Sequence, residues 1–552
     1  MEIKHFHGLT PRVPSENLLF NHATEAVDVD LRHGTLKPWR SSKAVKNVAT
    51  TTKHVHHHNC CWVEFDTCVE VAEWTVQCPR LYVTGEADYP TVRQLNADCT
   101  TGECGVIRLG IPAPNSALSA RALPASKPTN TSHIPDAQER ESRSYVYTYV
   151  NCLGEEGPPS YPTPQLDTDD GNPVTLTGFA RPPAEYGITH IKIYRQVTAY
   201  RDESQVQQGM VAPQTDFFHV ATIPVGQATH IDGGLNVDTL GEALATLDVL
   251  EPPATLRGIS SIPNTRMLVG FSGNTLCFSM NNQPWNWPLS QRYELDDNII
   301  AIKPFRGKVV VMTDGHPYTV EVGDGVNTRA CRSVLRHDTP MPMVTCGNAN
   351  GAITTPMGVF YVSDRGVVVM GAGEPTVITY PWFLVDDWRT LQPQSMHLGW
   401  YDGCLFITSV VDTFVLQLDA LGNAEYNRLT RLSVRPQQYF TSRHGELFYL
   451  LNNTIHHWQA GSELLPYYWK SGVLDTKQFN SIGAVRLWGN GETHMEIFAE
   501  HLNVFGPFLI QPNTAHRLPR YGHHLHHQVA FSGVQEVVSV EMAQSRWELS
   551  TT

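Results

Sequence analysis

The strongest constraint on the fold is a repeated pair of short apolar runs in the second half of the chain. In each pair, β-branched and aromatic residues flank a tight polar turn, which is the pattern of a β-hairpin. The five copies span residues 264–280, 307–322, 358–371, 402–419 and 444–459. Their openings lie about 42 to 51 residues apart, near the roughly 40 to 50 residue period of propeller blades.

One hairpin cannot bury both of its faces, whereas four-stranded sheets packed radially can. We therefore predict an all-β fold, a β-propeller of about six to seven blades, with a stacked β-sandwich as the structural alternative. Runs at 62–76 and 80–85 are candidate strands for the blades that the N-terminal region supplies.

A segment of different character interrupts the blades. Short strands separated by turns follow residue 144, and Tyr145, Tyr147 and Tyr149 alternate onto one face. This pattern predicts an inserted β-sandwich of fibronectin type III or immunoglobulin type. The predicted divisions are an N-terminal arm with the first propeller strands (1–110), a linker or long loop (111–143), the fibronectin III-like β-sandwich insertion (144–252), the main propeller blades (253–465), and a closing blade or small C-terminal β-domain (466–552).

Charge and cysteine content restrict the function. The chain has 40 Lys and Arg against 54 Asp and Glu, a formal net charge of −14, which disfavours tight retention of nucleic acid through its phosphates. It has no apolar stretch of membrane-spanning length and no apolar leader at its start. The eleven cysteines are therefore expected to be buried, reduced thiols in a protein made in a cytoplasm.

Catalytic motifs are missing from the sequence. It contains no phosphate-binding G-x-x-x-x-G-K-[ST], no G-x-S-x-G and no H-E-x-x-H, and neighbouring carboxylates such as Asp296 and Asp297 would face opposite sides of a strand. Trp285, Trp287 and the run 467–469 are candidates for a sugar platform, although inter-blade packing is the favoured interpretation. We predict that the chain is not an enzyme, and we assign no catalytic, cofactor-binding or metal-binding residue and no cofactor.

Two histidine clusters stand out, His54–His58 and His523–His527. On a strand, alternate histidines of the first cluster share one face, where imidazoles could bind zinc or nickel with Cys60 as a further ligand. The polar flanking residues instead favour a solvated surface or a subunit contact. Whether either cluster binds metal stays open.

Residues 276–323 resemble the central segment of tail nozzle proteins of short-tailed bacteriophages, also called packaged-DNA stabilisation or tail accessory proteins. The features that carry the likeness are a strand ending in Ser, a Pro/Trp-rich turn, a Tyr-x-Leu strand and an apolar run into Thr-Asp-Gly. They correspond here to Ser279, Pro284, Trp287, Pro288, Tyr293, Leu295, Thr313, Asp314 and Gly315. The segments 351–370, 467–474 and 516–549 and the opening residues, with Gly34, Leu36 and Pro38, fit the same family.

The resemblance implies a virion structural protein of the phage tail. Its subunits would self-associate into a ring, expected to be a hexamer, below the portal and adaptor, with tail fibres or spikes at the periphery. The ring would extend the DNA channel, retain the packaged genome and permit its ejection, without sequence-specific DNA binding and without a membrane-spanning segment. The alternative is a receptor-binding or fibre-docking protein that recognises a surface glycan.

Overall fold

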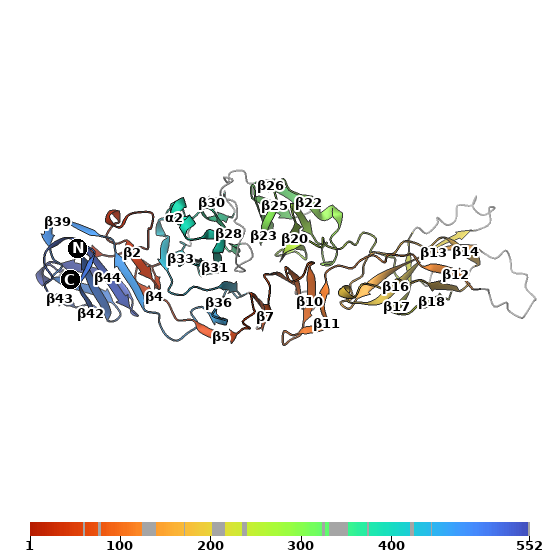
Figure 1. Ribbon diagram of the computed structural model, residues 1–552, viewed down its shortest axis with the longest axis horizontal. Helices are drawn as coiled ribbons and strands as arrows, with labels where there is room; N and C mark the ends of the chain where they lie inside the picture. The colour runs from red at the N-terminus through yellow and green to blue at the C-terminus, as the bar shows by residue number, and fades with distance from the viewer. Residues whose placement is uncertain are drawn as a thin grey trace, which may run out of the picture. The chain divides into compact units, whose positions relative to one another are not determined.

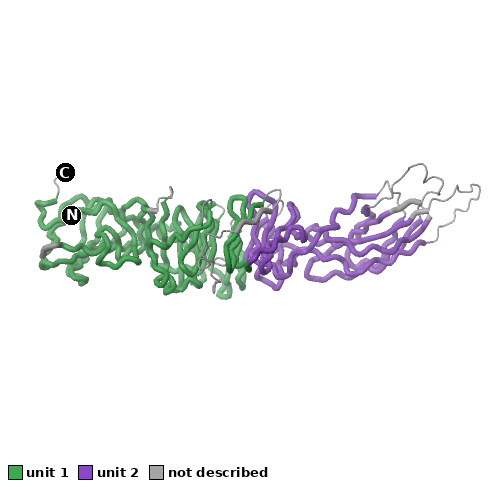
Figure 2. Tube along the Cα trace, turned by 90° about the horizontal axis from the view of Figure 1, so that it is seen from above, with its two compact units in different colours: residues 1–69, 297–552 green, residues 70–296 purple. Residues whose placement is uncertain are grey.

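The computed structural model describes residues 1–58, 61–74, 79–123, 140–169, 172–200, 216–233, 240–322, 326–330, 351–371, 375–419, 424–442 and 444–549. The chain divides into two compact units (Figure 2). Unit 1 comprises residues 1–69 and 297–552, and unit 2 comprises residues 70–296. The described elements are almost all β-strands (Figure 1), and the α-helix α2 (Val385–Thr390) is short.

Unit 1 contains four four-stranded antiparallel meanders in its described residues. They are β23 (Ile299–Phe305), β24 (Lys308–Thr313), β25 (Tyr318–Val322) and β26 (Val326–Ala330); β27 (Ala352–Thr355), β28 (Gly358–Ser363), β29 (Gly366–Met370) and β30 (Thr376–Val377); β31 (His397–Tyr401), β32 (Cys404–Thr408), β33 (Thr413–Gln417) and β34 (Arg428–Arg431); and β35 (Gln438–Thr441), β36 (Leu447–Leu451), β37 (Thr454–His457) and β5 (Lys43–Asn47).

The meanders of unit 1 stack in the manner of propeller blades. The first strand of each sheet contacts the first strand of the next, from β23 to β27, β31 and β35, and β35 then contacts β6 (His54–His58) of the hairpin that β6 forms with β7 (Cys61–Phe65). Every residue of β28, β32 and β33 is buried, as expected for strands covered on both faces. The central strand pairs β24–β25, β28–β29, β32–β33 and β36–β37 fall on four of the five predicted hairpins, so the predicted all-β propeller fold is confirmed.

Unit 2 contains two further meanders and a sandwich. The meanders are β8 (Glu70–Trp74), β9 (Arg80–Thr84), β10 (Thr91–Leu95) and β11 (Thr101–Arg108), and β19 (Arg257–Ser261), β20 (Leu268–Ser272), β21 (Thr275–Phe278) and β22 (Arg292–Glu294). Their first strands, β8 and β19, again contact each other, and β20–β21 is the remaining predicted hairpin.

The insertion folds as two sheets around one core. One sheet holds β12 (Ser119–Ala122), β15 (Val174–Thr177) and β18 (Thr229–Asp232), and the other holds β14 (Leu166–Asp169), β13 (Arg140–Asn151), β16 (Ile188–Tyr200) and β17 (Phe218–Pro224). Tyr145, Tyr147 and Tyr149 are 0–2% exposed and lie in this core, so the predicted sandwich and its tyrosine face are confirmed. Deep in the sandwich, Arg195 forms an ion pair of 2.8 Å with Asp232, which also accepts a hydrogen bond from Tyr145.

The last part of the chain forms a small β-domain together with the N-terminal strands. Its sheets are β1 (Glu2–Ile3), β45 (Val537–Ala543), β40 (Ala484–Gly489) and β43 (Ala515–Arg517), and β2 (Ala23–Val27), β38 (Tyr467–Ser471), β44 (His524–Gly533), β41 (Thr493–Ala499), β42 (Leu502–Ile510) and β39 (Leu474–Asn480). Their apolar side chains share one core with those of the blade strands β28 and β31–β34, and the N-terminus lies in this domain (Figure 1). We call residues 1–38 with 466–549 the closing domain; its sheet of β2, β38, β44, β41 and β42 is continuous with the blade strands β31–β34 through the β2–β34 pair.

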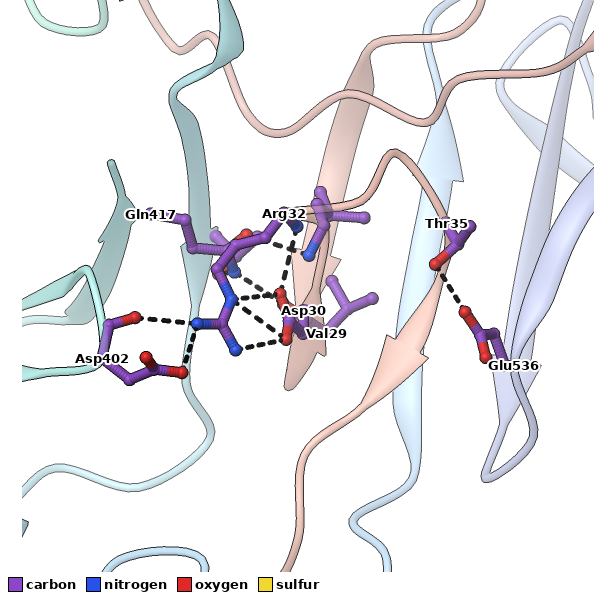
Figure 3. A network of polar contacts seen from close by, with 9 residues as sticks. Val29, Asp30, Arg32, Thr35, Asp402, Gln417 and Glu536 are labelled. Atoms are coloured by element: carbon purple, nitrogen blue, oxygen red, sulfur yellow. Dashed lines mark hydrogen bonds and ion pairs between the residues drawn. The ribbon is translucent and has the colours of Figure 1, made fainter. Parts of the chain in front are cut away.

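The N-terminal arm ties the closing domain to the blades. Its strand β2 lies between β34 and β38 in one ten-stranded sheet, and β5 completes the sheet of β35–β37. Figure 3 shows the polar contacts along this path: Arg32 forms ion pairs with Asp30 at 2.9 Å and with Asp402 at 2.7 Å, while Thr35 donates to Glu536 at 2.8 Å. Segments that are hundreds of residues apart therefore meet at Arg32 and its neighbours.

Three parts of the sequence interpretation are corrected. The predicted linker 111–143 contains β12 and the start of β13, because short alternating runs inside a Pro- and Ser-rich segment pair with later strands. The compact units divide after Val69 and after Asp296, not at the predicted boundaries. Several cysteines are disulfide-bonded instead of reduced, including Cys104 with Cys152, whereas Cys277 and Cys404 are buried free thiols.

Candidate functional site

In the first histidine cluster, His58 is buried and His54, His56 and His57 are half-buried. His58 is 3% exposed, and the His57 ring lies 4.3 Å from the Trp62 ring and 5.2 Å from the Phe448 ring. The Gln438 amide donates to His54 Nδ1 at 2.7 Å. Cys60, the proposed fourth ligand, lies outside the described residues, and the neighbouring Cys61 is in a disulfide.

The second histidine cluster makes contacts with its own domain. His526 pairs with Glu500 at 2.8 Å; the hydrogen bonds from His526 lower the pKa of Glu500 to about 2, and the same pair raises the pKa of His526. His527 is buried, where it donates to the carbonyl of His524. No group of three or more metal-ligating side chains gathers in the described ranges.

The candidate sugar platforms are packing groups. Trp287 and Trp469 are 0% exposed and Tyr467 is 1% exposed. The partly buried Trp285 donates to the carbonyl of Glu156 at 3.0 Å. These rings fill the interior, as the favoured interpretation predicted.

A cavity of about 590 Å³ lies between the start of β31 and the segment that leads into β35. Its lining is formed by Thr50, Thr52, Lys53, Ser395, His397, Ser409, Val410, Arg435, Pro436, Gln437, Gln438, Leu450 and Asn453. His397 is 5% exposed and donates from Nε2 to the carbonyl of Pro436 at 2.6 Å. Burial lowers the pKa of His397 from the usual 6.5 to about 4.

This buried histidine predicts loss of stability in mild acid. The unfolded chain takes up a proton at His397 near pH 6.5 and the folded chain only near pH 4, so the folded state loses stability as the pH falls through that interval. At pH 5 the loss is on the order of 2 kcal/mol. Urea unfolding at pH 7.5 and pH 5.0 measures it, and His397→Gln should show a smaller drop because its amide does not titrate. An equal drop in the variant and the wild-type protein would refute this role of His397.

A second cavity, of about 920 Å³, lies in the closing domain. It is bounded by the start of β40, by β43 and the residues after it, and by the 3-10 turn Arg546–Glu548 that follows β45. Its charged lining residues are all arginines, namely Arg486, Arg517, Arg520 and Arg546, and no Asp, Glu or Lys lines it. The sequence alone does not reveal this site, because its arginines are spread over some sixty residues and only the sheet of β45, β40 and β43 brings them together.

Three of the four arginines in this cavity have no counter-charge among the described residues that line it. Within the described chain, no ion pair or hydrogen bond engages the side chains of Arg517, Arg520 or Arg546, all three of which are exposed. Trp547, also in the lining, is 96% exposed. Unpaired guanidinium groups around a hollow can hold carboxylates or phosphates through bidentate hydrogen bonds, so this is the candidate functional site.

Comparison with known proteins assigns no family. No family model and no curated protein matches the chain. Among solved structures, virginiamycin B lyase from Staphylococcus aureus is 11% identical, with 76% of this chain and 99% of that chain covered and a TM-score of 0.30. The Pan2 WD40 domain of Neurospora crassa is 10% identical, with 50% of this chain and 87% of that chain covered and a TM-score of 0.24. The Cps50 (Swd1) β-propeller domain of Myceliophteria thermophila is 8% identical, with 51% of this chain and 89% of that chain covered and a TM-score of 0.23. These identities and TM-scores are too low to carry an argument about function. No helix in the described residues is long and apolar enough to cross a membrane.

Proposed function

We propose that the chain is a structural subunit of a phage tail nozzle, a ring that extends the DNA channel, retains the packaged genome and permits its ejection. The observation that carries the proposal is where the family-like segments lie. Residues 276–323 run from β21 to β25, residues 351–370 hold β27–β29, and the segments 467–474 and 516–549 belong to the closing domain. The family-like segments therefore cover strands of the blades and of the closing domain in chain order, and none of these segments lies in the sandwich.

The charge of the chain supports a passage for DNA. A net charge of −14 per subunit, repeated around a ring, gives a field that repels phosphate and lets a duplex slide instead of adhering. The proposal assigns no catalytic role to the chain. The sandwich formed by β12 to β18, with its own core, is suited to a peripheral contact with fibres or spikes.

Virions assembled without this chain test the proposed function. Such particles are expected to package DNA but to lose it, so their DNA becomes sensitive to added nuclease before contact with a host. Complementation with the wild-type chain should restore protection. Particles that keep their genome and eject it normally without the chain would contradict the proposal.

Recognition of a surface glycan is the second candidate, and the cavity beside His397 is the observation that favours it. Its hydroxyl and amide side chains, such as Thr52, Ser409, Gln437 and Asn453, are groups that hydrogen-bond sugars. Binding of the isolated chain to a glycan array, abolished by Gln437→Ala and Asn453→Ala, would favour this function over the nozzle. Absence of binding would remove it.

A further inference from the structure

The arginine cavity concentrates positive charge on an acidic chain. Elsewhere in the described residues, several buried or half-buried arginines have carboxylate partners, such as Arg32 with Asp30, Arg80 with Glu155 and Arg195 with Asp232, whereas Arg428 bonds to backbone carbonyls. In the cavity, Arg517, Arg520 and Arg546 have none within the described chain. Like charges gathered in a hollow repel each other, and an anionic partner relieves that repulsion.

The exposed Trp547 identifies the kind of partner. A tryptophan that is 96% exposed leaves a large apolar surface in water, which is unusual for this residue. Tryptophan and arginine are the side chains most enriched at the energetic centres of protein interfaces, whereas lysine is depleted there. The cavity has four arginines and this tryptophan and no lysine in its lining, which favours a protein partner over a phosphate-tracking groove.

We propose that this cavity receives carboxylate side chains of a second copy of the same chain. The inference rests on the proposed function, since a ring requires each subunit to present one surface to the different surface of its neighbour. Charge complementarity points to the same occupant: outside these four arginines, the chain carries 36 Lys and Arg against 54 Asp and Glu. Bidentate pairing of the guanidinium groups with carboxylates fixes the orientation of the neighbour.

Self-association of the full-length chain tests the proposal. Sedimentation velocity and mass photometry at physiological salt are expected to show oligomers for the wild-type chain. Arg517→Glu with Arg520→Glu should weaken association at least about tenfold, and Trp547→Ala should do so by a similar factor. A matched control, Arg40→Glu with Arg181→Glu, makes the same change of charge at exposed arginines outside the cavity and should associate as the wild-type chain does.

The outcomes separate the competing explanations. Equal thermal unfolding of the cavity variant and the control shows that a loss of association is not a loss of folding. Association of the cavity variant at wild-type strength, or a monomeric wild-type chain at tens of micromolar, would overturn the proposal. Loss of binding to a 30-base-pair DNA duplex without any change in association would instead assign the cavity to nucleic acid. A nozzle ring seen in virions built from the cavity variant would refute the inference and leave the proposed function standing.

Discussion

Replacing Cys104 and Cys152 by serine is expected to lower the free energy of unfolding of unit 2 by about 4 kcal/mol. The disulfide joins β11 of a blade to the residue that follows β13 of the sandwich, across 48 residues of chain. In the chain-entropy description, closing a loop of this length restricts the unfolded state by about that amount.

Denaturant unfolding of oxidised protein measures this effect. The double variant Cys104→Ser/Cys152→Ser should unfold at a lower denaturant concentration than the wild-type chain. Because further cysteines are disulfide-bonded, the comparison is repeated in reducing buffer, where the difference between the two proteins should shrink. A difference below about 1 kcal/mol in oxidised protein would show that the crosslink contributes little.

Truncating Arg32 is expected to cost about 3 kcal/mol of unfolding free energy in unit 1. Asp30 is 4% exposed and accepts two hydrogen bonds from the Arg32 guanidinium, at 3.0 Å from Nε and 2.9 Å from Nη2 (Figure 3). Arg32→Ala removes the guanidinium and leaves this buried carboxylate the backbone N–H of residue 32, at 3.1 Å; breaking a buried pair on one side typically costs about 3 to 5 kcal/mol.

The other carboxylate on Arg32 provides the control. The side chain of Asp402 is 67% exposed, so Asp402→Asn removes a solvent-screened contact and should cost less than about 1 kcal/mol. Arg32→Lys keeps the charge but loses the paired geometry, and its effect should lie between the two. Equal effects of Arg32→Ala and Asp402→Asn, measured by chemical denaturation, would show that the buried pair does not hold the arm in place.

The blades could be predicted because their signal is local. Each central strand pair, such as β28–β29 or β32–β33, is two apolar runs around a turn, and that pattern is visible within twenty residues. The tyrosine face of β13 is equally local, since alternate residues of a strand share one side.

The pairing of the chain ends could not be predicted from such patterns. In the β5–β37 pair, Asn47 lies opposite Thr454, and in the β2–β38 pair, Ala26 lies opposite Trp469. Partners that are some four hundred residues apart have no signature in either segment alone. The strand β12 could not be predicted for the same reason. It lies in a Pro- and Ser-rich stretch and is a strand because it pairs with the distant β15.

The arginine cavity and the disulfides could not be predicted from the sequence, for related reasons. Four separated arginines among forty basic residues do not stand out until β40 and β43 pair. Cys104 and Cys152 are 48 residues apart, and no local pattern marks either of them as a disulfide partner.

Electron cryomicroscopy of purified virions that carry this chain tests the central claim most directly. The proposal predicts density for the chain as an axial ring at the tail tip, with several copies around the DNA passage and the sandwich formed by β12 to β18 at its periphery. Density for the chain only in fibres, or absence of the chain from the virion, would contradict it.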